Sequence, residues 1–73
     1  MEKGEINIFQ IEECQVYYEV ELWESGDCDS HFFHRKSYAI SFFEKHKKHE
    51  SDCIKRHYAD VFGGDCELVK ENR

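Results

Sequence analysis

The sequence predicts one α+β domain in which a small antiparallel β-sheet of three to four strands packs one or two helices on one face. Residues 16–23 alternate between apolar side chains and acidic or aromatic ones, whereas residues 39–46 carry apolar side chains at helical spacing. Turn-forming residues separate these segments. The predicted order is β-β-β-α-α-β, and residues 1–73 form a single domain because a chain of 73 residues is too short for two cores.

Composition and cysteine usage predict a cytoplasmic location. Hydrophobic residues make up 40% of the chain, which is enough to form a core, and no apolar run approaches the ~18 residues that span a bilayer. The first residues lack the basic start and apolar stretch of a signal peptide. We therefore expect a cytoplasmic protein without membrane contact, in which the four cysteines are thiols.

Three strands are predicted in the first half of the chain. Residues 6–11 are apolar with mixed periodicity, and we interpret them as a strand. In the next strand one face carries Val16, Tyr18, Val20 and Leu22, and the other carries Tyr17, Glu19, Glu21 and Trp23. Residues 25–30 are turn formers, so residues 31–35 are predicted to pair back as the second arm of a hairpin.

Two helices, or one bent helix, are predicted after this hairpin. Ser37 is the expected N-cap of the first helix, in which Ala39, Ile40, Phe43 and His46 lie near one face. Ser51 or Asp52 is the expected cap of the second helix, whose stripe consists of Cys53, Ile54, His57, Tyr58, Val61 and Phe62. Gly63 and Gly64 are predicted to end it, and residues 65–69 to return as the last strand.

Cysteine and histidine spacing suggests a structural zinc site. Cys28 and His31 are separated by two residues in the predicted turn, and Cys53 and His57 lie one turn apart in the predicted second helix. A hairpin and a helix that share one zinc ion resemble a ββα zinc finger, although the spacer here is longer. The alternative is that the cysteines are small buried apolar residues. The replacement ligands are His34, His49 and Cys66.

Charge is polarised along the chain and suggests a protein-binding surface. Residues 1–30 carry nine acidic residues and a single lysine, whereas residues 31–57 carry seven basic and three acidic residues. Such an acidic part suits a partner with a basic groove, in which carboxylates imitate phosphates and an exposed tryptophan provides an anchor. The predicted partner-binding residues are Glu19, Glu21, Trp23, Glu24, Asp27 and Asp29, with Glu12 and Glu13 near the strand end. The alternative is an ordinary solvated sheet face, partly covered by residues 6–11.

Short acidic domains with a charged hairpin face and no catalytic motif resemble the small phage-encoded proteins that inhibit host nucleases and polymerases, anti-CRISPR proteins among them. The resemblance is one of size, charge and architecture over the whole chain. It implies a monomeric, non-enzymatic inhibitor in the cytoplasm of a bacterial host. Its partner would be a nucleic-acid-binding effector such as a Cas nuclease, whose DNA loading it would block.

The sequence favours two other functions less. A zinc-stabilised nucleic-acid-binding module would use the basic middle segment, but the net charge of −6 argues against direct binding to nucleic acid. The basic residues of that segment are Arg35, Lys36, Lys45, Lys47, Lys48, Lys55 and Arg56. An enzyme would need a nucleophile such as Cys53 beside His57, and the sequence marks no orienting third residue for that pair.

Overall fold

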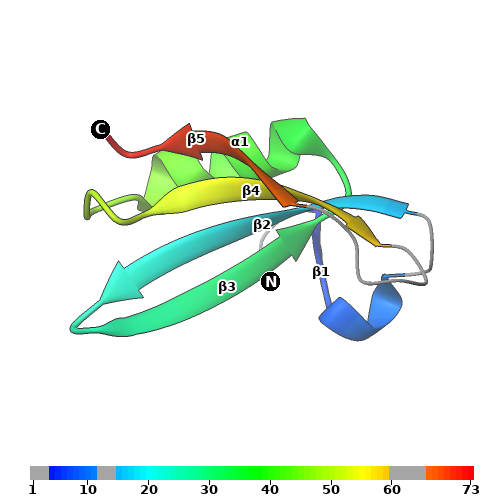
Figure 1. The fold of residues 1–73 in the computed structure, drawn as a ribbon, viewed down its shortest axis with the longest axis horizontal. Coiled ribbons are helices and arrows are strands. Elements are labelled where there is room, and N and C mark those ends of the chain that lie inside the picture. Colours follow the sequence, from blue (N-terminus) through cyan, green and yellow to red (C-terminus); the bar gives the residue numbers. More distant parts are fainter. Residues whose placement is uncertain (1–3, 12–14, 60–65) are drawn as a thin grey trace.

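Five strands and one α-helix make up the structure, a computed structural model that describes residues 4–11, 15–59 and 66–73 (Figure 1). The elements are β1 (Glu5–Ile6), the 3-10 turn η1 (Ile8–Gln10), β2 (Gln15–Glu24), β3 (Asp27–Phe33), α1 (Lys36–His46), β4 (Cys53–Ala59) and β5 (Cys66–Glu71). All strand pairs are antiparallel, in the order β1-β3-β2-β4-β5. The predicted α+β class is confirmed, with a larger sheet and a single helix in the described residues.

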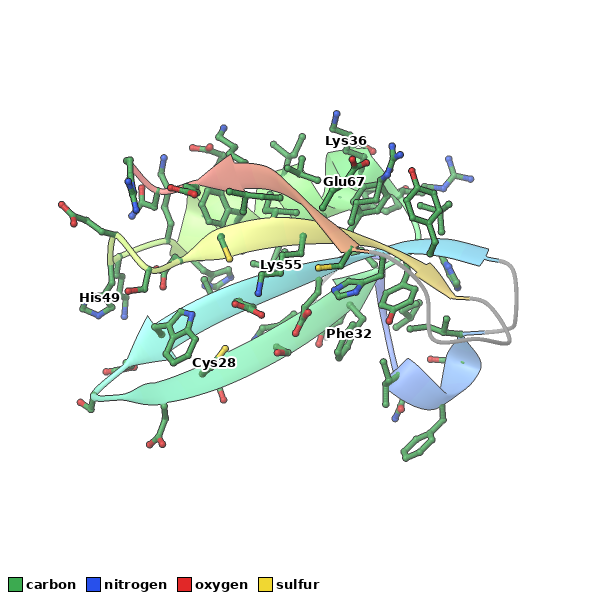
Figure 2. All side chains as sticks on the ribbon, viewed as in Figure 1. Cys28, Phe32, Lys36, His49, Lys55 and Glu67 are labelled. Atoms are coloured by element: carbon green, nitrogen blue, oxygen red, sulfur yellow. The ribbon has the colours of Figure 1, made fainter. Side chains whose placement is uncertain are left out.

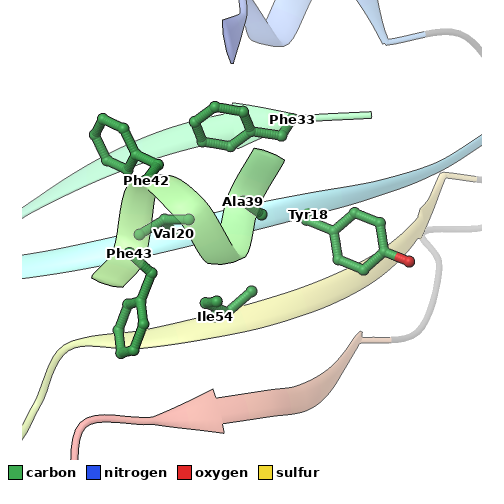
Figure 3. Packing of buried hydrophobic residues seen from close by; sticks show 7 residues of the cluster. All are labelled: Tyr18, Val20, Phe33, Ala39, Phe42, Phe43 and Ile54. Atoms are coloured by element: carbon green, nitrogen blue, oxygen red, sulfur yellow. The ribbon is translucent and has the colours of Figure 1, made fainter. Parts of the chain in front are cut away.

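The core lies between α1 and the middle strands of the sheet (Figure 3). Strand residues Tyr18, Val20, Phe33 and Ile54 pack against helix residues Ala39, Phe42 and Phe43. A fully buried side chain such as that of Phe43 stabilises the fold by roughly 1.5–3 kcal/mol. The inward face predicted for residues 16–23 is confirmed at Tyr18 and Val20, which are buried, and at Leu22, which packs against the cluster, whereas Val16 is 38% exposed.

The β2–β3 hairpin is tighter than predicted. Its connection is only Ser25 and Gly26, whose φ angles of 52° and 85° are those of a two-residue turn with both central residues left-handed. Residues 27–30, predicted as turn, therefore belong to β3, which ends at Phe33. The second arm of the hairpin was predicted at residues 31–35 but lies at residues 27–33, because several turn-forming residues occupy strand positions.

The predicted second helix is wrong, because residues 53–59 form strand β4 between β2 and β5. Cys53, Ile54, His57 and Tyr58 fit a helical period, but in the strand the buried side chain of Ile54 faces α1 while Cys53 and Lys55 lie on the other face. Pairing with strands on both sides selects the extended conformation. Val61, Phe62, Gly63 and Gly64 lie outside the described residues, and the predicted last strand is confirmed as β5.

Local hydrogen bonds replace the predicted strand at residues 6–11. The Asn7 side chain accepts from the Phe9 N–H, and the Gln10 side chain accepts from the Asn7 N–H at 2.7 Å. This capping box closes η1 and limits β1 to two residues. The predicted cap Ser37 is also wrong, since α1 begins at Lys36 after Arg35 with no side-chain cap. No helix within the described ranges is long and apolar enough to cross a bilayer.

Candidate functional site

The sheet face opposite α1, here named the open face, carries a polar and aromatic surface (Figure 2). Residues that pair across antiparallel strands share a face, and the pairs Trp23–Cys28, Glu21–Ser30 and Glu21–Cys53 continue this face across three strands. The described residues of the open face are Tyr17, Glu19, Glu21, Trp23, Cys28, Ser30, Phe32, Cys53, Lys55, His57, Cys66 and Leu68.

Glu19 is enclosed by donors at the centre of this face. One carboxylate oxygen lies 2.8 Å from His57 Nε2, and the other accepts from the Ser30 hydroxyl at 2.6 Å. The Tyr17 ring stacks on the His57 imidazole with centroids 4.9 Å apart. Only 15% of the Glu19 side chain is exposed. Burial, followed by the charge of Glu19, raises the pKa of Tyr17. The Glu19 carboxylate is therefore committed to contacts within the sheet.

Glu21 is held in the same way. Its carboxylate pairs with Lys55 Nζ at 3.0 Å and accepts from the Cys53 thiol at 3.5 Å. The hydrogen bond that Lys55 donates to Glu21 raises the pKa of Lys55. Burial, together with the neighbouring Glu21 charge, raises the pKa of Cys53 to about 11. Burial and the same charge also raise the pKa of Cys28, so both thiols stay protonated at neutral pH.

The structure does not bring the four predicted zinc ligands together. Cys28 and His31 are three residues apart in a strand, so their side chains leave opposite faces of the sheet. The His31 ring packs against Phe42 of α1, with centroids 4.6 Å apart, whereas Cys28 lies on the open face. Within residues 4–11, 15–59 and 66–73, no group of three or more potential ligands converges.

Cys53 and His57 also do not form the nucleophile pair considered above. Four residues of strand separate their α-carbons by about 13 Å, since each residue advances roughly 3.3 Å. Their side chains instead bond to two different carboxylates, those of Glu21 and Glu19. The open face therefore offers a protonated thiol and a carboxylate-bound imidazole that do not interact with each other.

The end of the β2–β3 hairpin, residues 23–29, differs from the rest of the sheet and is here named the hairpin tip. Pairing of β2 with β4 ends at Glu21 and Cys53, so the tip projects past β4 (Figure 1). The buried Asp52 carboxylate anchors it by accepting the Trp23 N–H at 2.7 Å. Asp52 also accepts the N–H groups of Lys48 and His49. Burial alone would raise the Asp52 pKa, but these three hydrogen bonds hold that pKa below its ordinary value.

The hairpin tip is acidic, and its charges are not compensated. Glu24, Asp27 and Asp29 are exposed, and none of them has an ion pair within the described part of the chain. Trp23 is 36% exposed and lines two hollows of about 110 and 250 Å³. Glu24 and Asp29 line these hollows with Trp23, although their side chains leave the hairpin on the side of α1 and the indole leaves it on the open face.

Among the basic residues of the middle segment, Lys47, Lys55 and Arg56 form ion pairs at separate places in the fold. Lys47 pairs with Glu44 at 2.9 Å on α1, and Arg56 pairs with Glu67 at 2.8 Å between β4 and β5. Lys55 lies on the open face with Glu21. Lys47, Lys55 and Arg56 therefore do not join into one phosphate-binding patch.

Of the six predicted partner-binding residues, four lie at the hairpin tip and two at the centre of the open face. Glu12 and Glu13 lie outside the described residues. The partners of the central carboxylates, which are Ser30, Lys55 and His57, were not predicted from the sequence. Reading residues 53–57 with an alternating period would have placed Lys55 and His57 on one strand face, and pairing with β2 brings that face beside Glu19 and Glu21.

Comparisons of this chain with protein-family models, with curated proteins and with solved structures found no match.

Proposed function

We propose that this protein is a non-enzymatic inhibitor that binds a nucleic-acid-processing effector, such as a Cas nuclease, through the hairpin tip. The observation that carries the proposal is a contrast within the described residues: Glu24, Asp27 and Asp29 at the tip have no ion pair, whereas Glu19 and Glu21 at the centre of the open face are paired. Carboxylates of Glu24, Asp27 and Asp29 would occupy basic positions that otherwise hold phosphates, and Trp23 would be the aromatic anchor.

Direct binding to nucleic acid is the less favoured function. Phosphates would meet a repulsive tip, and three cations that could attract them are already in ion pairs: Lys47, Lys55 and Arg56. The protein alone should therefore give no gel shift with DNA or RNA at low salt.

An inhibition assay tests the proposal. Purified effectors, a guide-loaded Cas nuclease and a bacterial RNA polymerase among them, are mixed with labelled DNA at several salt concentrations, and DNA binding is measured with and without the protein. We expect inhibition that weakens as salt rises, because the contact between acidic tip and basic groove is electrostatic. Failure to inhibit any effector would contradict the proposal.

Matched variants locate the inhibiting surface. Asp29→Asn and Ser41→Lys each raise the net charge by one, but Ser41 is exposed on α1 behind the sheet. Asp29→Asn and Trp23→Ala should weaken inhibition about tenfold, which corresponds to ~1.4 kcal/mol of binding free energy. Ser41→Lys should leave it unchanged. Equal effects of Asp29→Asn and Ser41→Lys would show that net charge, and not the tip, determines inhibition.

A further inference from the structure

Part of strand β3 has an unpaired edge. β3 pairs with β2 along its whole length, but on its other side β1 covers only Phe32 and Phe33. Residues 27–31 therefore have no strand on that side within the described ranges, and Figure 1 shows this stretch along the lower border of the sheet. Backbone N–H and C=O groups of alternate residues point outward from such an edge and can pair with another strand.

The other edge of the sheet is less suited to pairing. β5 has a bulge where its register with β4 shifts between Ile54 and Lys55. A bulge along an edge hinders the addition of a strand. By contrast, the register of β3 with β2 is regular from Asp27 to Phe33. The unpaired part of β3 is thus the more favourable edge.

The chain itself already adds a strand to this edge of β3. β1 lies antiparallel to it, with Glu5 opposite Phe33 and Ile6 opposite Phe32. The Glu5 carboxylate holds β1 in place through His31 Nδ1 at 3.1 Å. At Asn7 the chain turns into η1 and leaves the edge, so an extended segment from another molecule could continue along residues 27–31.

Charge selects the kind of segment that fits. Asp27 and Asp29 alternate with Cys28 and Ser30, so the two carboxylates share one face of the edge. A second copy of this chain that paired edge to edge would bring like charges together, which is unfavourable. Lysine or arginine side chains at alternate positions of an added strand would instead lie opposite the two carboxylates.

We propose that residues 27–31 of β3 accept an extended basic segment of the partner protein as an added strand of the sheet. Backbone hydrogen bonds would provide affinity, and cations opposite Asp27 and Asp29 would select the segment. This inference rests on the proposed function, since the edge belongs in part to the hairpin tip, and it names the class of partner surface that the tip binds.

Peptide titration of the full-length ¹⁵N-labelled protein tests the edge directly. The probe is an acetylated, amidated peptide of about eight residues that alternates lysine and threonine, a length sufficient for one strand. Binding should shift the amide signals of residues 27–31 and slow hydrogen exchange of their outward N–H groups. Two further peptides carry N-methyl groups on alternate residues, one on the lysines and one on the threonines.

Only one set of alternate N–H groups in an added strand points toward β3, so one methylated peptide should bind and the other should not. Equal binding of both would overturn strand addition and indicate simple charge attraction. The double variant Asp27→Asn and Asp29→Asn should bind the unmodified peptide about tenfold more weakly. The control variant Glu67→Gln should bind it as the wild type does, and equal weakening in both would overturn the role of the two aspartates.

The inhibition assay separates this inference from the proposed function. The protein could inhibit an effector through the tip while the peptide neither binds the protein nor displaces it from the effector. In that case only the strand-addition proposal is overturned. If the peptide binds as expected and no effector is inhibited, the strand-addition proposal is supported and the proposed function is contradicted. A dimer in sedimentation analysis whose interface, located by amide signal shifts, includes residues 27–31 would overturn the proposal in favour of a second copy as the occupant.

Discussion

The centre of the open face and the hairpin tip both carry carboxylates, but those at the centre bond to neighbouring side chains and those at the tip are exposed. At the centre, Glu19 and Glu21 are largely covered and bonded to His57, Ser30, Lys55 and Cys53. At the tip, Glu24, Asp27 and Asp29 are exposed and have no ion pair among the described residues. Within one hairpin, cross-strand partners decide whether a carboxylate stabilises the sheet or remains available to another molecule.

Asp52 joins the hairpin tip to the turn after α1, and its removal should have the largest effect. Asp52→Ala leaves the N–H groups of Trp23, Lys48 and His49 without their acceptor. We expect a loss of about 3 kcal/mol in the free energy of unfolding, because unsatisfied buried donors are costly. Urea unfolding followed by circular dichroism measures this loss. A loss below about 1 kcal/mol would mean that water replaces the carboxylate at these donors.

Acid should remove the same stabilisation. The pKa of Asp52 in the folded protein lies below its ordinary value of 3.8, so folding favours the ionised carboxylate. The stabilisation is fully present well above pH 3.8 and is lost as the pH falls through 3.8 toward the folded pKa. Urea unfolding from about pH 6 to about pH 2 should therefore show a difference between wild type and Asp52→Asn that shrinks in acid. A constant difference would contradict the role of ionised Asp52.

A matched pair of substitutions compares the centre with the tip. Glu21→Gln and Asp29→Asn each remove one carboxylate charge from the hairpin. Glu21→Gln should cost about 1 kcal/mol of unfolding free energy, because Lys55 loses its ion pair in a half-buried setting. Asp29→Asn should stay within about 0.5 kcal/mol of wild type. Partner binding should show the reverse order, and the same order in both measurements would remove the distinction between the regions.

The comparison also explains which parts of the fold could be predicted from sequence. The alternation in β2 and the apolar stripe of α1 each fit a single period, so both elements were predicted correctly. Residues 53–58 fit both periods, and only pairing with β2 and β5 decides between them. The zinc prediction depended on that choice, since Cys53 and His57 are neighbours on a helix but about 13 Å apart on a strand.

Asp52 shows why tertiary contacts limited the prediction of the site. Ser51 or Asp52 was predicted to cap a helix that followed it, and this prediction is wrong because residues 53–59 form a strand. The observed donors to Asp52 precede it in the turn after α1 or come from Trp23, 29 residues away in sequence. The ion pairs of Glu19 and Glu21 likewise depend on a strand that comes more than 30 residues later.

The smallest expected effect is on the reactivity of the cysteine thiols towards a labelling reagent. Cys53 is buried beside the Glu21 carboxylate with a pKa of about 11, whereas Cys28 and Cys66 are exposed. Iodoacetamide at about pH 8 should modify Cys66 long before Cys53, because about one Cys53 in a thousand is then a thiolate. Glu21→Gln should speed Cys53 labelling by lowering this pKa, and Asp29→Asn should not. Peptide mapping by mass spectrometry measures both rates. Equal labelling of Cys53 in the two variants would show that burial alone, without the Glu21 charge, protects the thiol.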